Sequence, residues 1–295
     1  MIRVVLSIVQ ETHPEGISML TSLNLRRSLI GSALLLAICV ASPSLFANDA
    51  LISKGRELFN KHSDAVVSIA GNLSLDISMM GQQEQPISVL GTVIDASGLV
   101  LTSNTAMNPI GDEEVTVEPQ PGMELSITAK LGDLWIDLPG GERISVEPVL
   151  IDPLHDVAIL RPKDAEKAAE LGKRALNSSP ATTAPEVLEP LIVLGRTGEM
   201  SNRVPTVDIV HARAKVETPR PCTMISAPVG SPVFNGSGAL IGIVTTLSSG
   251  EEFDPMMMMG GGGAGGAPVV NPWSALKPII DQAQQKTETK AAEGL

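Results

Sequence analysis

The residues of this chain that could carry nucleophilic chemistry lie in three short stretches. The first ends at Thr105, the second holds Asp156 directly before an apolar run, and the third contains Ser231. Hydroxyl groups and a carboxylate are two of the three groups that acyl transfer requires, and the third is an imidazole that accepts the proton of the nucleophile. The chemistry that these stretches suggest is therefore hydrolysis, provided that a histidine joins them.

The histidines fit this role poorly. His155 precedes Asp156, and neighbouring residues of a strand point to opposite faces, so His155 should point away from the carboxylate. His211 lies in the middle of a predicted strand, and His62 lies on a predicted N-terminal helix. We therefore expect no general base beside Ser231.

In the same order, the three stretches resemble the His, Asp and Ser regions of the HtrA/Deg-type serine proteases. The resemblance covers about Val66 to Gln285. It implies an all-β fold of two six-stranded antiparallel β-barrels of the trypsin-like type, with an N-terminal helix, a helix and linker between the barrels, and a C-terminal helix. The runs that carry the resemblance are Gly91-Thr-Val-Ile-Asp-Ala-Ser-Gly-Leu-Val-Leu-Thr-Ser-Asn-Thr105, Asp156-Val-Ala-Ile-Leu160 and Gly230-Ser-Pro-Val-Phe-Asn-Gly-Ser-Gly-Ala-Leu-Ile-Gly-Ile-Val244.

The resemblance implies a site that has lost two of its three catalytic groups. It places Thr105 at the histidine, Asp156 at the aspartate and Val229 at the serine nucleophile. A threonine hydroxyl does not take up protons near neutral pH, and a valine cannot attack a carbonyl. Loss of the serine or the histidine alone costs about 10⁶ in turnover in such a triad. We therefore predict a pseudoprotease that binds a peptide or protein partner as a scaffold or regulatory module.

Two alternatives stay open. In the first, the chain is a weakly active or rewired serine endopeptidase that uses Ser231, two residues after Val229. In the second, it is an unrelated small barrel or sandwich, and the three matches are fortuitous. The remnant of the oxyanion loop, whose backbone could form an anion-binding nest, is predicted at Ala227, Pro228, Val229 and Gly230.

The N-terminus has the features of a secretory signal. Arg26 and Arg27 precede the apolar run Ser28 to Val40, which is too short for a comfortable membrane span, and a cleavage region ends at Ala47. We expect an exported mature chain without a transmembrane segment, in the bacterial periplasm or outside the cell. An uncleaved anchor is the alternative, and Met19 is the alternative start.

Short β-rich runs separated by turn residues begin after Ala65, which is typical of a barrel or sandwich. A helix-forming segment and a linker rich in Ser, Pro and Thr divide these runs into two groups. Pro278 should weaken or delay the closing helix. The predicted organisation is a signal peptide at 1–47, an N-terminal helix and first barrel at 48–162, a linker at 163–186, a second barrel at 187–286 with a Met/Gly-rich loop at 250–267 and a closing helix, and a tail at 287–295.

Composition excludes several classes of function. The formal net charge of −12 disfavours a nucleic-acid partner. Cys222 is the one cysteine after the predicted cleavage, and the histidines show no ligand spacing, so we expect a buried thiol and neither a metal nor a cofactor. The run Met256 to Met259 disfavours copper binding, because consecutive side chains of an extended chain alternate sides.

The resemblance also bears on assembly. It implies a homo-oligomer, because this family often forms trimers. The nine residues after Lys286 leave no room for the C-terminal PDZ domain that the family usually carries.

Overall fold

The structure is a computed structural model that describes residues 43–111, 114–120, 122–247 and 266–293. Contacts divide the chain into a unit Met1–Ala47 and a compact unit Asn48–Leu295, and the fold described below is that of the second unit. The predicted signal peptide up to residue 42 and the predicted loop 250–265 lie outside the described residues. No helix within the described ranges is both long enough and apolar enough to span a bilayer.

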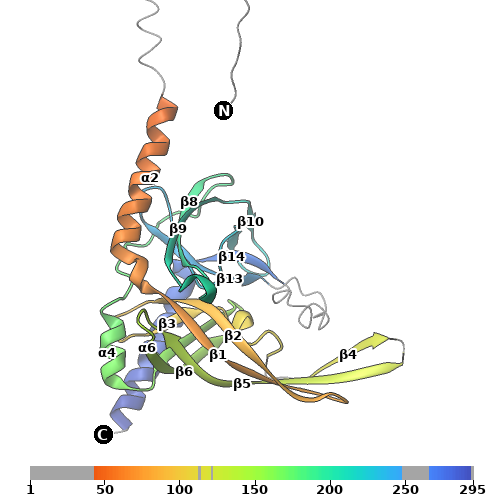
Figure 1. The fold of residues 1–295 in the computed structure, drawn as a ribbon. Coiled ribbons are helices and arrows are strands. Elements are labelled where there is room, and N and C mark those ends of the chain that lie inside the picture. The colour runs from red at the N-terminus through yellow and green to blue at the C-terminus, as the bar shows by residue number, and fades with distance from the viewer. Residues whose placement is uncertain (1–42, 112–113, 121, 248–265, 294–295) are drawn as a thin grey trace, which may run out of the picture. The chain divides into compact units, whose positions relative to one another are not determined.

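The first sheet closes into a six-strand barrel (Figure 1). Its order is β1-β2-β3-β7-β6-β5-β4, with antiparallel neighbours, and β1 also pairs with β5 to close the ring. Burial alternates along its strands: Leu73, Leu75 and Ile77 are buried, while Asn72 and Asp76 are exposed. This alternation places apolar side chains inside the barrel. The strands are β1 (Val66–Ile77), β2 (Gly81–Val93), β3 (Val100–Thr102), β4 (Val115–Gln120), β5 (Met123–Asp137), β6 (Arg143–Asp152) and β7 (Val157–Pro162).

The second sheet is curled rather than fully closed. Its order is β10-β11-β14-β13-β12-β8-β9, so β9 and β10 lie at its two edges. The sequence analysis placed His211 in the middle of a strand, but in the structure β9 ends at His211 and β10 begins after the bend Ala212–Arg213. The bend turns the chain from β8 to β11 and curls the sheet. The strands are β8 (Pro190–Arg196), β9 (Pro205–His211), β10 (Ala214–Val216), β11 (Cys222–Met224), β12 (Pro232–Phe234), β13 (Leu240–Leu247) and β14 (Ala267–Pro272).

Helices cover the two sheets. The first barrel is followed by α4 (Ala165–Gly172), which begins after Asp164, whose carboxylate caps the helix by accepting from the N–H of Lys167. On α2 (Pro43–His62), Leu58 packs against Ile192 and Phe234 of the second sheet. The remaining short helices are α3 (Asn104–Met107), η1 (Ser63–Ala65) and η2 (Glu199–Ser201).

The closing helix α6 (Trp273–Glu293) packs against both sheets. Its residues Leu276 and Ile280 share one buried cluster with Leu101 of β3 and Ile243 of β13. The expectation that Pro278 delays the helix was wrong, since the helix begins five residues before it. A proline so near the start removes one intrahelical hydrogen bond, and the packing against both sheets compensates for that loss.

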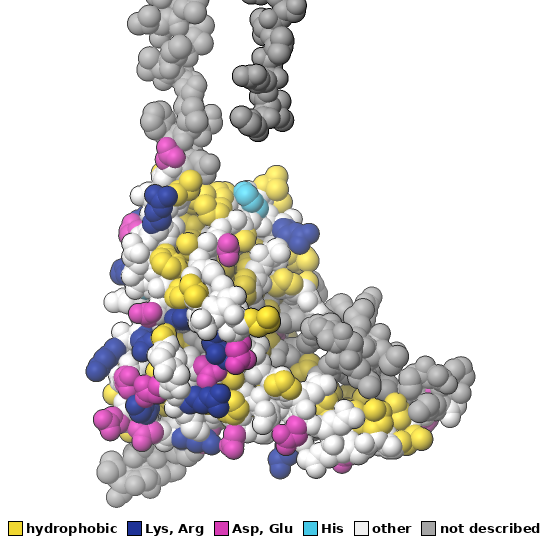
Figure 2. Space-filling view, in the orientation of Figure 1, with side chains coloured by type: hydrophobic (Ala, Val, Ile, Leu, Met, Phe, Trp, Pro, Cys, Tyr) yellow, Lys and Arg dark blue, Asp and Glu magenta, His cyan; other side chains and the backbone are white. Residues whose placement is uncertain are grey.

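Surface charges are mixed in sign. On the face shown in Figure 2, Lys and Arg lie interspersed with Asp and Glu over the first barrel, and hydrophobic side chains are more frequent over the second sheet. Exposed large apolar side chains occur in both parts: Leu188, Met200 and Val204 flank strands of the second sheet, and Met79 and Leu154 lie in turns of the first barrel. On the face shown, charged side chains are the more frequent over the first barrel.

Candidate functional site

Asp156 forms the centre of the candidate site, in the turn that joins β6 and β7. The residue is 4% exposed and has a left-handed backbone conformation with φ of 52°. Its Oδ2 accepts hydrogen bonds from the hydroxyl of Ser103 and the backbone N–H of Thr246, each at 2.6 Å. Its Oδ1 accepts from the backbone N–H of Thr105 at 2.7 Å. The carboxylate therefore joins three chain segments, two from the first barrel and one from β13 of the second sheet.

The short helix α3 presents Thr105 to this carboxylate. Ser103 is the N-cap, and its hydroxyl oxygen accepts from the N–H of Ala106 at 3.1 Å while its proton is donated to Asp156. A serine at this position satisfies an otherwise free amide of the first turn. The N–H of Asn104 also donates to the backbone oxygen of Asp156 at 3.3 Å. The contact of Thr105 with Asp156 is therefore made by its backbone.

The predicted oxyanion-loop remnant lies against the first barrel. Gly230 has φ of 87°, and a Cβ there would lie 1.9 Å from the backbone oxygen of Leu90, so only glycine fits. Its N–H donates to the oxygen of Val244 at 2.7 Å, and its own oxygen accepts from the hydroxyl of Thr92 at 2.7 Å. These bonds fix the loop between the two sheets.

Within this loop, Val229 and Ser231 have different surroundings. Val229 is partly buried and packs against the apolar core of the second sheet. Ser231 is fully buried, and within the described part of the chain its hydroxyl has no hydrogen-bond partner. The backbone N–H groups of Ala227 and Val229 make no hydrogen bond that the described residues record. The loop thus has two backbone N–H groups that could donate hydrogen bonds to an incoming oxygen.

The structure brings together Thr105 and Asp156 by a direct hydrogen bond. Val229 is connected to them through β13, because Val244 bonds the loop and Thr246, two residues further on, bonds Asp156. The side chain of Val229 packs on the second-sheet core and makes no recorded contact with the carboxylate.

None of the histidines in the described ranges contacts Asp156. The ring of His155 lies 3.2 Å from Asp152. His62 is buried and stacks on Phe234 at 6.1 Å between ring centroids, and burial, reinforced by the charge of Lys61, lowers its pKa. His211 is exposed on β9.

Behind Asp156 lies a buried polar network that the sequence reasoning missed. Arg220 is 6% exposed, and its Nε donates to Asn271 at 2.9 Å while its Nη2 donates to the oxygen of Thr246 at 3.1 Å. Its Nη1 donates to the oxygen of Leu154, and Asn271 donates to the oxygen of His155 at 2.5 Å. Burial lowers the pKa of Arg220, which nearby Cys222, Asp156 and Asp152 partly offset. The sequence feature that could have drawn attention to this network is Arg220, which lies between Pro219 and Pro221.

The described side chains are poorly arranged to bind a metal ion. Over the described ranges, no group of three or more His, Cys, Asp or Glu side chains is placed to hold one. Cys222 is a buried free thiol, and burial raises its pKa. A protonated thiol is a poor nucleophile and a poor metal ligand.

Comparisons with known proteins agree with this architecture. The model of the trypsin-like peptidase domain matches residues 90–243, more than half of the 295 residues and a range that includes Thr105, Asp156 and Val229. A search of curated proteins found no match.

Among solved structures, the fold is similar to that of the HtrA-type protease AlgW solved with a decapeptide. The TM-score is 0.54 at 14% identity, over 78% of this chain and 67% of that chain. The trypsin-like fold that the sequence predicted is thereby confirmed, with one closed barrel and one curled sheet. The chain belongs to the family of proteins with a trypsin-like peptidase domain.

Proposed function

We propose that this chain is a trypsin-like pseudoprotease that binds an extended segment of a peptide or protein without cleaving it. The observation that carries the proposal is the set of donors to Asp156. In a working triad the carboxylate orients an imidazole. Here it is buried and occupied by one hydroxyl and two backbone amides, and the residue at the histidine position, Thr105, supplies only its backbone. Asp156 thus acts as a structural bond between the two sheets.

The nucleophile position supports the same conclusion. Val229 has no group that can attack a carbonyl, and its side chain packs on the second-sheet core. The alternative nucleophile, Ser231, is 0% exposed and has no base beside its hydroxyl. A substrate could reach it only after the loop had left the first barrel, which would break the bond between Thr92 and Gly230. We therefore do not favour the rewired endopeptidase.

Binding has a structural basis that hydrolysis lacks. The free N–H groups of Ala227 and Val229 can donate to a carbonyl or carboxylate oxygen. An extended peptide can also pair with an unpaired strand edge, where main-chain hydrogen bonds provide affinity. The structurally similar HtrA-type protease was solved with a decapeptide. We extend this mode of binding to the present chain, together with export through the N-terminal signal and a homo-oligomeric state.

The first test measures binding and cleavage on the same peptides. A library of extended peptides is titrated against the purified chain by fluorescence anisotropy, and each mixture is then analysed by mass spectrometry. We expect saturable binding of a subset without any cleavage product. Val229→Pro removes one of the two free amides and should weaken binding, whereas Val229→Ile keeps the amide and should not. Absence of binding, or equal binding by both variants, would contradict the proposed role of the loop.

The second test addresses residual hydrolysis. A fluorophosphonate probe labels serines that are activated by a base. We expect no labelling of the folded protein. Labelling that is lost in Ser231→Ala but kept in Ser237→Ala would show that the chain is a rewired hydrolase and would overturn the proposal.

A further inference from the structure

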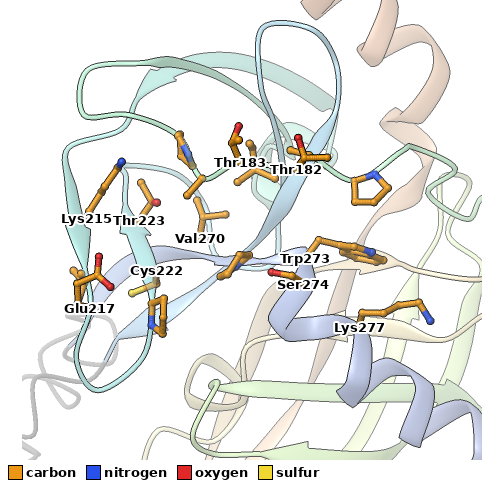
Figure 3. Close-up of a pocket in the computed structure, with 18 of the residues that line it drawn as sticks. Thr182, Thr183, Lys215, Glu217, Cys222, Thr223, Val270, Trp273, Ser274 and Lys277 are labelled. Atoms are coloured by element: carbon orange, nitrogen blue, oxygen red, sulfur yellow. The ribbon is translucent and has the colours of Figure 1, made fainter.

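A cavity of about 740 Å³ lies on the second sheet, and its lining residues include neither Asp156 nor the loop of Val229. It is bounded by the linker residues 180–185, by the hairpin of β10 and β11, and by the start of α6 (Figure 3). Its volume falls within the range of small-molecule sites, and the mouth of a curled sheet is a common place for such sites.

The cavity wall is formed by a row of paired residues. Lys215 of β10 pairs with Thr223 of β11, which pairs with Val270 of β14, so the three side chains lie on the same face of the sheet. Ile241 and Trp273 add apolar surface to the lining. Most of the wall is therefore hydrocarbon or aromatic, and burial of an apolar ligand there is favourable.

Thr223 provides the buried hydroxyl of the wall, whereas the other lining residues with hydroxyl groups, Thr182, Thr183 and Ser274, are exposed. The residue is 5% exposed, and its hydroxyl makes no hydrogen bond that the described residues record. In Figure 3 the side chain lies within the ring of lining residues, beside Val270. A hydroxyl can donate one hydrogen bond and accept others, and buried polar groups in proteins are nearly always paired. An unpaired hydroxyl that opens into a cavity is the partner that a ligand's own hydroxyl would need.

The charges at the rim are largely compensated. The ammonium of Lys215 lies 2.7 Å from Glu186, and Lys277 is paired with Asp281. Glu217 is the remaining charged residue of the lining and is exposed. The rim therefore offers neither a free cation for an anionic head group nor a purely acidic surface for a cationic one.

We propose that this cavity binds an uncharged single-chain amphiphile, with its hydrocarbon on the wall around Val270 and its hydroxyl on Thr223. The apolar lining selects the hydrocarbon, and the one buried hydroxyl among the lining residues, that of Thr223, orients the polar end. The compensated rim disfavours a charged head group, which would lose hydration without gaining a free counter-charge. The lining residues do not include the Val229 loop that we propose for peptide binding.

The experiment uses a homologous series of n-alcohols from hexanol to decanol. Trp273 lines the cavity, the chain has two tryptophans and no tyrosine, and Trp135→Phe therefore leaves Trp273 as the only strong fluorophore. Fluorescence titration of this variant, supported by calorimetry, should show affinity rising about fourfold with each methylene. Octanoate and octylammonium should bind more weakly than octanol.

A matched pair of variants tests Thr223, and a third variant tests the mouth of the cavity. Thr223→Val should weaken octanol binding about two- to tenfold, while Thr223→Ser, which keeps a hydroxyl, should restore it. Ser274→Phe adds a ring at the exposed mouth and should block the whole series without affecting the core. The proposal is overturned if no alcohol binds saturably, if affinity does not grow with chain length, if either charged analogue binds tighter than octanol, or if Thr223→Val or Ser274→Phe leaves binding unchanged.

Discussion

Two of the polar residues buried where the sheets meet, Asp156 and Ser231, have opposite surroundings. Asp156 accepts hydrogen bonds from three donors that come from both sheets. Ser231 is fully buried, and its hydroxyl has no partner among the described residues. A carboxylate that joins chain segments has a structural role whether or not the protein is catalytic, whereas the hydroxyl of Ser231 contributes no hydrogen bond to the fold. The comparison shows that two buried polar residues near each other can differ widely in what they contribute to stability.

If Asp156 stabilises the fold and Ser231 does not, the largest loss of stability is expected from a substitution at Asp156. Asp156→Asn keeps the shape but removes the charge and turns an amide NH₂ toward groups that themselves donate. Unfolding free energy should fall by about 3 to 5 kcal/mol, because charge-assisted hydrogen bonds are lost and buried donors lose their acceptor. Chemical denaturation measures the change. Asp133→Asn, on an exposed side chain, is the control, and a loss below 1 kcal/mol at position 156 would remove the structural role we assign.

A second large effect on stability is expected at Arg220, which donates hydrogen bonds to the turn that contains Asp156 and to β13. Arg220→Met fills a similar volume but removes donors to Asn271, Thr246 and Leu154. We expect a loss of about 2 to 4 kcal/mol, since the buried acceptors lose their partner. Arg213→Met is the matched control, on an exposed side chain of the same sheet. Equal thermal melting temperatures of the two variants would show that the network is dispensable.

A pair of serine variants compares the surroundings of Asp156 with those of Ser231 directly. Ser103→Ala removes one donor to Asp156 and the cap of α3, and should cost about 1 to 2 kcal/mol. Ser231→Ala removes a hydroxyl that has no partner, and should change stability by less than about 0.5 kcal/mol or raise it. Both are measured by urea unfolding. A larger loss in Ser231→Ala than in Ser103→Ala would reverse the comparison.

The smallest expected effect is a dependence of folding stability on pH that arises from His62. Burial lowers its pKa in the folded state below the usual 6.5, so the unfolded chain binds the proton more readily. Stability should therefore decrease as pH falls below about 6.5, in the direction that linkage requires. The measurement is the melting temperature of the wild type minus that of His62→Gln between pH 8 and 5. A difference that does not vary with pH would exclude a contribution from His62.

Much of the fold could be predicted from sequence because its signals are local. The β-rich runs, the turn residues between them and the helix-forming segment after the first barrel each reflect the conformation of a few neighbouring residues. The split of β9 from β10 and the start of α6 before Pro278 could not be predicted in this way. Both depend on packing between the sheets, which overrides local preference.

Site residues could be located from the sequence only at positions that the resemblance to serine proteases defines. Thr105 and Asp156 meet because the backbone of α3 carries the contact, which does not depend on the side chain at 105. The burial of Ser231 and the network around Arg220 depend on residues far apart in sequence, such as Asn271 and Thr246. Such contacts leave no periodic signal in the chain.

The tight fit of Gly230 against Leu90 has a consequence for how activity is inferred from a sequence. A side chain at Gly230 would collide with the Leu90 backbone, and one at Gly242 would lie 1.8 Å from the oxygen of Asn271. Both glycines belong to the run that resembles the nucleophile region of serine proteases, yet backbone packing alone requires glycine at each position. Glycines in such a run therefore indicate how the chain folds and do not by themselves indicate that it is a peptidase.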